Sequence, residues 1–171
     1  MGREVYRYLV EGPDEKNLVD TLKSQLPPYV KVGKVEVFNV VQKKITLEKI
    51  RTWPKDVIVI LIFDTDTENT SILSENIRML NKNQHIGKVL CIPQYRKLED
   101  EIARTIKAKS ALDLFATKSK GDFKTMFANE KELMAKLQKW DFDFSKLWTK
   151  QPPEKYRNAG VVNNSDKVKL R

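Results

Sequence analysis

The chain has 171 residues, of which 40% are apolar and 32% are charged, and it carries a net charge of +9. This length suits one domain, or one domain with an appendage, and the apolar fraction excludes a largely disordered chain. The longest apolar run, Val57–Phe63, is far too short to cross a membrane, and a single cysteine excludes an internal disulfide framework or a cysteine-based zinc site.

The first half of the chain alternates between short β-rich runs and runs with helical spacing of apolar residues. Strands are expected at residues 5–10, 35–41, 57–63 and 88–92. Helices are expected between them at residues 14–26, 46–53 and 71–81. This alternation predicts an α/β domain over residues 1–93, with a mostly parallel, Rossmann-like four-stranded sheet flanked by helices.

Acidic residues follow two of the expected strands. Glu11 ends the first strand, and Asp64 and Asp66 follow the third. In open α/β sheets, ligands bind outside the carboxyl ends of the strands, so these side chains are expected at one edge. Carboxylates gathered there repel one another unless a cation is present, and Mg²⁺ needs only one or two protein carboxylates. The alternative is that each residue is an ordinary turn or helix-cap residue.

The run "YLVEGPDEKNLV", followed about fifty residues later by "VIVILIFDTDT", resembles the Toprim domain of topoisomerases, bacterial primases and OLD-type nucleases. The family signature is a glutamate, usually followed by glycine, after the first strand and an Asp-x-Asp after the third. Glu11-Gly12 and Asp64/Asp66 match it. The resemblance covers roughly residues 5–92, and Thr67 stands near a position where a glycine is common.

The form "VEGPxEK" is most similar to OLD-type nucleases and small standalone Toprim proteins, often linked to phage defence. The resemblance implies a Mg²⁺- or Mn²⁺-dependent nuclease in which Glu11, Asp64 and Asp66 are catalytic. It also implies that Glu15, four positions after Glu11, helps to hold a metal, with Asp14 as the alternative carboxylate. The chain is too short for the extra domains of a topoisomerase or a primase. The alternative function is a non-catalytic module that binds nucleic acid or a partner protein.

The second half loses the strand–helix alternation. Residues 94–150 are expected to form a helical extension packed on the sheet domain, with Phe123, Phe127 and Trp140 in its core. Residues 151–171 read as a polar, partly flexible tail. Residues 99–101, "EDE", follow the fourth strand closely, and they either add a metal ligand or only complement a helix dipole. His85, the only histidine, is a weak candidate for a catalytic base.

Basic residues are concentrated in the second half. Residues 1–92 carry 14 Lys/Arg and 12 Asp/Glu, whereas residues 93–171 carry 18 and 11. This asymmetry favours contact with a polyanion, most commonly DNA or RNA. Lys118, Lys120 and Lys124 surround a predicted loop that either suits phosphate binding or is only a solvated, lysine-rich surface. No membrane contact is expected, the N-terminus does not resemble a signal peptide, and a cytoplasmic protein is expected. The sequence leaves open whether the chain forms a homodimer or binds a partner protein.

Overall fold

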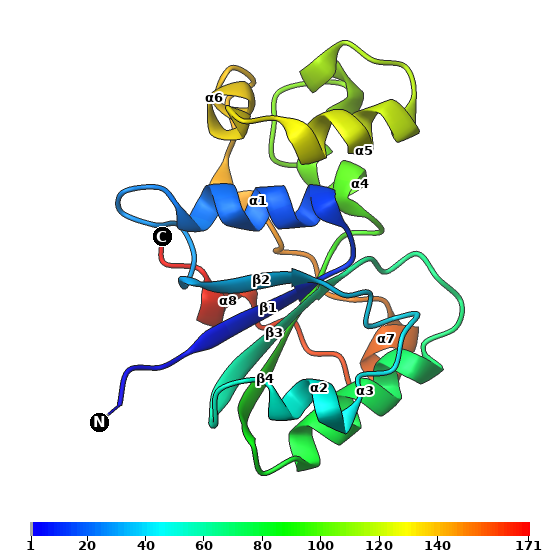
Figure 1. The fold of residues 1–171 in the computed structure, drawn as a ribbon. Helices are drawn as coiled ribbons and strands as arrows, with labels where there is room; N and C mark the ends of the chain where they lie inside the picture. Colours follow the sequence, from blue (N-terminus) through cyan, green and yellow to red (C-terminus); the bar gives the residue numbers. More distant parts are fainter. Residues whose placement is uncertain (1) are drawn as a thin grey trace.

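The computed structural model describes residues 2–171 and contains one four-stranded sheet in which every strand pair is parallel (Figure 1). The strands are β1 (Tyr6–Val10), β2 (Gly33–Val37), β3 (Val57–Phe63) and β4 (Ile86–Pro93). They lie in the order β2-β1-β3-β4. The expected α/β fold with helices on the sheet is therefore confirmed, and the sheet is wholly parallel.

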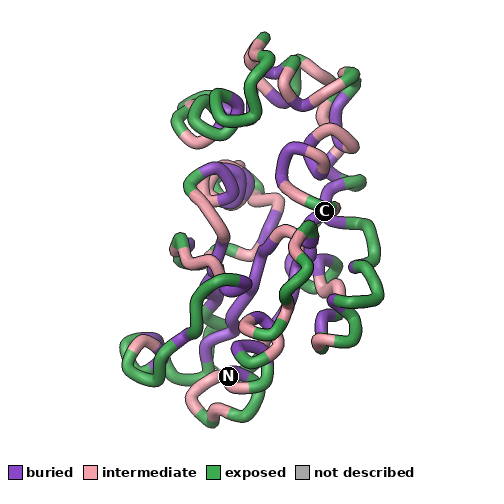
Figure 2. Tube along the Cα trace, turned by 90° about the vertical axis from the view of Figure 1, so that its right-hand side faces the viewer, coloured by how far each residue is buried: buried purple, intermediate pink, exposed green. Residues whose placement is uncertain are grey.

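Successive side chains of a strand point to opposite faces, and the sheet separates two hydrophobic cores in this way. Tyr8 and Val10 of β1 belong to one core, whereas Leu9 belongs to the other. All of β3 is buried, as its uninterrupted apolar sequence predicts, and Figure 2 shows the buried trace running through the centre of the molecule.

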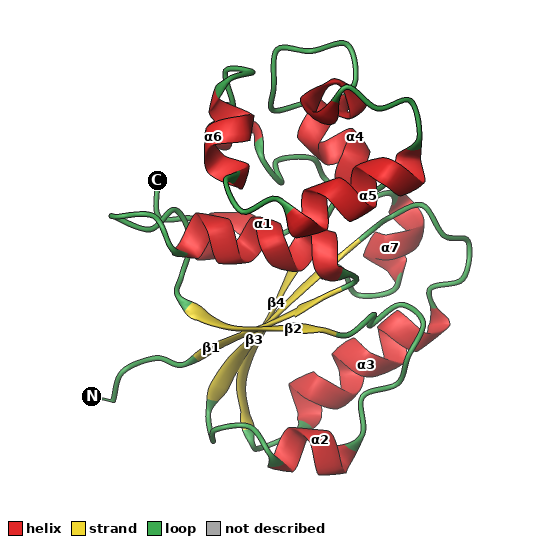
Figure 3. Cartoon of the chain, turned by 45° about the horizontal axis from the view of Figure 1, so that its top comes forward, coloured by secondary structure: helices red, strands yellow, loops and turns green. Residues whose placement is uncertain are grey.

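Helices cover both faces of the sheet (Figure 3). One face carries α1 (Pro13–Lys23), α4 (Leu98–Ala103), α5 (Lys120–Asn129) and α6 (Leu133–Gln138). The other carries α2 (Leu47–Arg51), α3 (Ser71–Lys82) and α7 (Glu154–Asn158). The chain thus turns to one face after β1 and to the other after β3, and these two strands are neighbours. This division places a topological switch point at the carboxyl ends of β1 and β3.

β2 and the first helix of the extension are among the elements that are shorter than the sequence predicts. β2 ends at Val37 rather than at residue 41, because Asn39 Oδ1 accepts hydrogen bonds from Val41 N at 3.0 Å and Gln42 N at 3.3 Å and forms a turn. Val40 and Val41 stay buried, so the turn itself contributes to the core. The run "PQYRKLEDEIARTIKA", residues 93–108, has helical spacing of apolar residues, but its helix is limited to Leu98–Ala103.

The helical extension packs on the sheet domain through α1. Asn17 Nδ2 donates to Phe127 O at 2.8 Å and to Glu130 O at 2.9 Å, which ties α1 to the end of α5. Phe123 and Phe127 are fully buried and Trp140 packs partly buried against the same core, so their predicted core role is confirmed, whereas Met126, which has the same helical spacing, is exposed. Two short 3₁₀ helices, η1 (Ala111–Phe115) and η2 (Phe144–Lys146), complete the extension.

Residues 151–171, expected as a polar tail, contribute α7 and α8 (Ser165–Val168). Asn164 N donates to Cys91 O at 2.8 Å, and Asn164 Oδ1 accepts from Cys91 N at 2.9 Å. The segment therefore covers the outer edge of β4, and the buried Tyr156 and Val161 join the core beneath α3. None of the helices within residues 2–171 is long and apolar enough to cross a membrane.

Candidate functional site

The two sequence motifs meet at the switch point. Asp64 N donates a hydrogen bond to Glu11 Oε1 at 3.1 Å. Gly12 permits this crowding at the end of β1, because a Cβ there would lie 2.8 Å from Asp14 Oδ1 and 3.2 Å from Glu15 Oε2. A larger residue would force these carboxylates to move.

The Asp64–Asp66 loop is held by contacts on both of its sides. Thr65 Oγ1 donates to Gln94 O at 2.6 Å and accepts from Arg96 N at 3.1 Å. On the other side, Tyr156 Oη is 3.2 Å from both the N and the O of Thr67. These contacts fix the loop at each end, while Asp66 between them is exposed.

A second pair of carboxylates comes from the first turn of α1. Asp14 and Glu15 are 5% and 4% exposed, and Asp14 Oδ2 and Glu15 Oε2 have no hydrogen-bond partner within residues 2–171. Helix capping does not account for them, since Gly12 is the N-cap residue and no side chain caps α1. The choice between Asp14 and Glu15 stays open, because both face the site.

Gln94 connects the two groups of carboxylates. It follows directly after β4 and is 1% exposed. Its Nε2 donates to Asp64 Oδ1 at 2.8 Å and lies 3.5 Å from Glu15 Oε1, while its Oε1 is buried and unpartnered in the described chain. Gln94 was not among the predicted site residues, although it follows the carboxyl end of a strand as Glu11 and Asp64 do.

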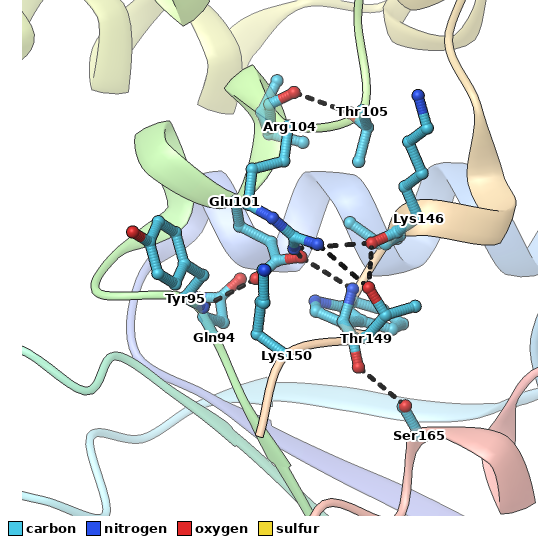
Figure 4. A network of polar contacts seen from close by, with 12 residues as sticks. Gln94, Tyr95, Glu101, Arg104, Thr105, Lys146, Thr149, Lys150 and Ser165 are labelled. Atoms are coloured by element: carbon cyan, nitrogen blue, oxygen red, sulfur yellow. Dashed lines mark hydrogen bonds and ion pairs between the residues drawn. The ribbon is translucent and has the colours of Figure 1, made fainter. Parts of the chain in front are cut away.

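In the acidic run at residues 99–101, Glu99 and Glu101 are both buried but have different surroundings. Glu99 is 6% exposed, neither of its carboxylate oxygens has a partner in residues 2–171, and it lies near Lys124. Glu101, by contrast, is structural: it accepts from Tyr95 N at 2.6 Å and Trp148 N at 2.7 Å, and it pairs with Arg104 at 3.0 Å (Figure 4). Glu101 thereby anchors α4, and with it Glu99, to the C-terminal half of the chain.

Burial and mutual repulsion oppose ionisation of this cluster. Burial raises the pKa of Glu15 to about 10, and the neighbouring Asp14 adds to the rise. Burial likewise raises the pKa of Asp64 to about 9, with repulsion from Glu11 and Asp66 as further causes. The pKa of Glu11 is raised as well, chiefly by burial. A bound cation would reverse this balance, because it favours the ionised carboxylates.

Lysines adjoin the cluster on the face that carries α5. Partial burial lowers the pKa of Lys124. The negative charges of nearby carboxylates have the larger combined effect and raise this pKa above its ordinary value; they belong to Glu99, Asp14, Asp64 and Glu15. The side chain of Lys120, at the start of α5, lies beside that of Lys97, which in turn is near Asp66. Lys118 lies in the exposed loop before α5. Of the three predicted lysines, Lys124 is the one whose pKa the carboxylates raise, although its side chain is exposed.

The donor set fits a hydrated divalent cation better than a closed metal cage. Within residues 2–171, no three Asp, Glu, His or Cys side chains converge closely enough to hold a metal ion by themselves. Several buried carboxylate oxygens nevertheless lack partners, and Mg²⁺ commonly keeps several waters and only one or two carboxylates. His85 directly precedes β4 and so lies at the amino-terminal ends of the strands, away from the carboxylates. Its Nε2 is 2.7 Å from Trp53 O.

Comparison of the chain with protein-family models, with curated proteins and with solved structures finds no match.

Proposed function

We propose that this protein is a Toprim-like, divalent-metal-dependent nuclease that hydrolyses phosphodiester bonds of DNA or RNA. The observation that carries the proposal is a chain of pairwise contacts at the switch point of a parallel sheet: Glu11 accepts from Asp64 N, and Gln94 links Asp64 to Glu15. Structural proteins have little reason to bury several carboxylates with unpartnered oxygens, since each one costs free energy of folding.

In this proposal Asp64 and Asp66 hold the metal, Mg²⁺ or Mn²⁺, and Glu15 or Asp14 supports a second one. The metal when bound supplies Lewis-acid polarisation of the phosphoryl group and neutralises its charge. Glu11 either binds the metal too or accepts the proton of the attacking water. Lys124 places a positive charge beside the cluster, where it stabilises charge that develops on the phosphate.

The basic second half supplies the long-range attraction for a polyanion. Lys97, Lys118 and Lys120 lie around the start of α5, on the same side of the site as Lys124. Exposed lysines of this kind contact backbone phosphates and carry no sequence information. The proposal therefore includes both DNA and RNA as substrates. The resemblance to OLD-type nucleases suggests phage defence as the biological setting.

The test is cleavage of labelled DNA and RNA by the purified protein with Mg²⁺ or Mn²⁺. Glu11→Gln and Asp64→Asn, which keep size and remove charge, should each lower the rate by at least about a hundredfold, while EDTA should abolish cleavage. Cleavage that persists in both variants would contradict the proposal, because it would come from another site or from a contaminant.

A non-catalytic nucleic-acid-binding module is the second candidate, and one observation favours it. No three metal-ligating side chains of the described chain are close enough to form a metal cage. That function predicts nucleic-acid affinity that is unchanged by EDTA, together with no turnover in any divalent metal.

A further inference from the structure

A cavity of about 280 Å³ opens beside the carboxylates on the face opposite α5. Glu11, Asp64 and Asp66 form one wall. Asn39 and Gln42, from the loop after β2, and Asn69, from the loop after β3, supply polar groups on the other side. The carboxylate cluster accordingly has a lysine-rich flank towards α5 and an amide-lined hollow on the other flank.

The amides of this cavity are oriented by their own loops. Asn39 Oδ1 accepts from Val41 N and Gln42 N, at 3.0 and 3.3 Å. Asn69 Oδ1 accepts from Ser71 N at 3.0 Å and from Ser71 Oγ at 2.7 Å. Because the oxygen of each amide is held by the loop, its NH₂ group remains as the donor for a ligand. The cavity therefore offers two pre-oriented donors next to the carboxylates.

The size and chemistry of the cavity limit its ligand. Its volume is near the lower end of small-molecule sites, about 300 Å³, which suits one nucleotide and not a stacked duplex. Amide donors match the carbonyl oxygens of a base or the oxygens of a phosphate. Ile72, half-buried at the start of α3, adds an apolar surface for a sugar or base.

We propose that this cavity binds the single nucleotide adjoining the scissile phosphate, in an unstacked conformation, on the side away from Lys124. This inference rests on the proposed nuclease function and specifies its substrate as a single-stranded or locally unpaired strand. The strand crosses the switch point from the lysines of the α5 face to Asn39 and Asn69. A base in a duplex enters only after it leaves the stack, which costs free energy.

The test uses the variants Asn39→Ser and Asn69→Ser, singly and together. A serine hydroxyl still accepts hydrogen bonds from the loop, but it removes the amide donor and adds no charge. Asn83→Ser is the matched control, because Asn83 Oδ1 accepts from His85 N at 2.8 Å in a similar turn at the opposite edge of the sheet. Gln42→Trp, at the exposed rim, is a second variant that narrows the cavity without altering the core.

Binding of a short fluorescent single-stranded oligonucleotide is measured by anisotropy in Ca²⁺, alongside the same strand in a duplex. Mn²⁺ binding to each protein is measured separately by electron paramagnetic resonance. The double serine variant and Gln42→Trp should bind the single strand about five- to thirtyfold more weakly, with Mn²⁺ binding unchanged. Asn83→Ser should match the wild type, and the duplex should bind more weakly than the single strand.

Two results overturn the cavity assignment and leave the nuclease proposal standing: unchanged single-strand affinity in the double variant, or a duplex bound as tightly as the single strand, in each case with normal Mn²⁺ binding. Absence of Mn²⁺ binding in the wild-type protein overturns both proposals.

Discussion

Asp64 N donates a hydrogen bond to Glu11 Oε1 at 3.1 Å, across 53 positions of sequence. The bond joins the ends of β1 and β3, which are neighbours in the sheet, at the point where the chain turns to opposite faces. Two acidic side chains are thereby brought together in a crevice where open α/β proteins bind ligands. The predictions below test whether this crevice holds a cation and what its neighbours contribute.

The first prediction concerns the dependence of stability on pH without metal. Glu15 and Asp64 have pKa values of about 10 and about 9 in the folded protein, above the ordinary values near 4 in an unfolded chain. The folded state therefore binds more protons in this window, so the free energy of unfolding should decrease as pH rises from about 4 towards 9. Thermal unfolding in EDTA measures this slope. Glu15→Gln and Asp64→Asn should each flatten it, and an unchanged slope in both would contradict the assignment.

The second prediction concerns Gln94. Gln94→Leu keeps the approximate volume but removes the donor to Asp64 Oδ1 and the nearby contact with Glu15. Partners that orient metal ligands typically contribute 10- to 100-fold in metal affinity, so Mn²⁺ should bind at least about tenfold more weakly. Titration with Mn²⁺ measures the change.

Gln84→Leu, an exposed substitution in the turn before β4, is the matched control and should bind Mn²⁺ as the wild type does. Gln94→Asn, which retains the amide but is shorter, should recover only part of the affinity. Equal Mn²⁺ affinity in Gln94→Leu and the wild type would mean that Gln94 fills space in the site and does not orient the metal ligands.

The third prediction separates Lys124 from Lys118. Lys124 is exposed but close enough to Glu99, Asp14, Asp64 and Glu15 for their charges to raise its pKa, whereas Lys118 is in the exposed loop before α5. Lys124→Met should therefore lower the cleavage rate at saturating substrate by about tenfold or more, because it removes charge beside the reacting phosphate. Lys118→Met should alter only substrate affinity, by a small factor that vanishes at high salt. Similar effects of the two substitutions on the rate would argue against a role for Lys124 in the chemistry.

The fourth prediction uses two glycines. Gly12→Ala places a Cβ 2.8 Å from Asp14 Oδ1, so the carboxylates must shift and Mn²⁺ affinity should fall. Gly121→Ala, in α5, meets only Ser119 Oγ at 3.7 Å and should leave Mn²⁺ affinity unchanged while stabilising the fold by up to about 1 kcal/mol. Metal titration and thermal unfolding of both variants check this pair, and normal Mn²⁺ affinity in Gly12→Ala would show that the carboxylates need no fixed position.

The parallel sheet, and the proximity of Glu11 and Asp64 at the ends of its strands, could be predicted from the sequence for a physical reason. Alternation of strands and helices implies a parallel sheet, and a parallel sheet brings strand ends together, so Glu11 and Asp64 were predictable neighbours. The single apolar run of β3 likewise predicted burial on both faces. The parallel sheet and its flanking helices are confirmed.

Other parts depended on tertiary contacts that no local pattern encodes. Glu99 and Glu101 are two positions apart in one acidic run, yet Glu101 is enclosed by Tyr95, Arg104 and Trp148 while Glu99 faces Lys124. Only the path of the C-terminal half decides between these roles. Tyr156 is a similar case, since it lies in a segment that reads as polar but bonds to Thr67 across 89 positions. Asn39 of the cavity was also missed, because it forms a turn two residues after β2, where the apolar pattern of the sequence continues.

The most direct test is an anomalous difference map from a crystal of the protein soaked in Mn²⁺. We expect a peak between Glu11 and the Asp64/Asp66 pair, with carboxylate oxygens at about the 2.0–2.2 Å typical of small divalent cations. The same soak of Asp64→Asn should show no peak or a much weaker one. A map of the wild-type protein without density at this position, at a high concentration of Mn²⁺, would contradict the account.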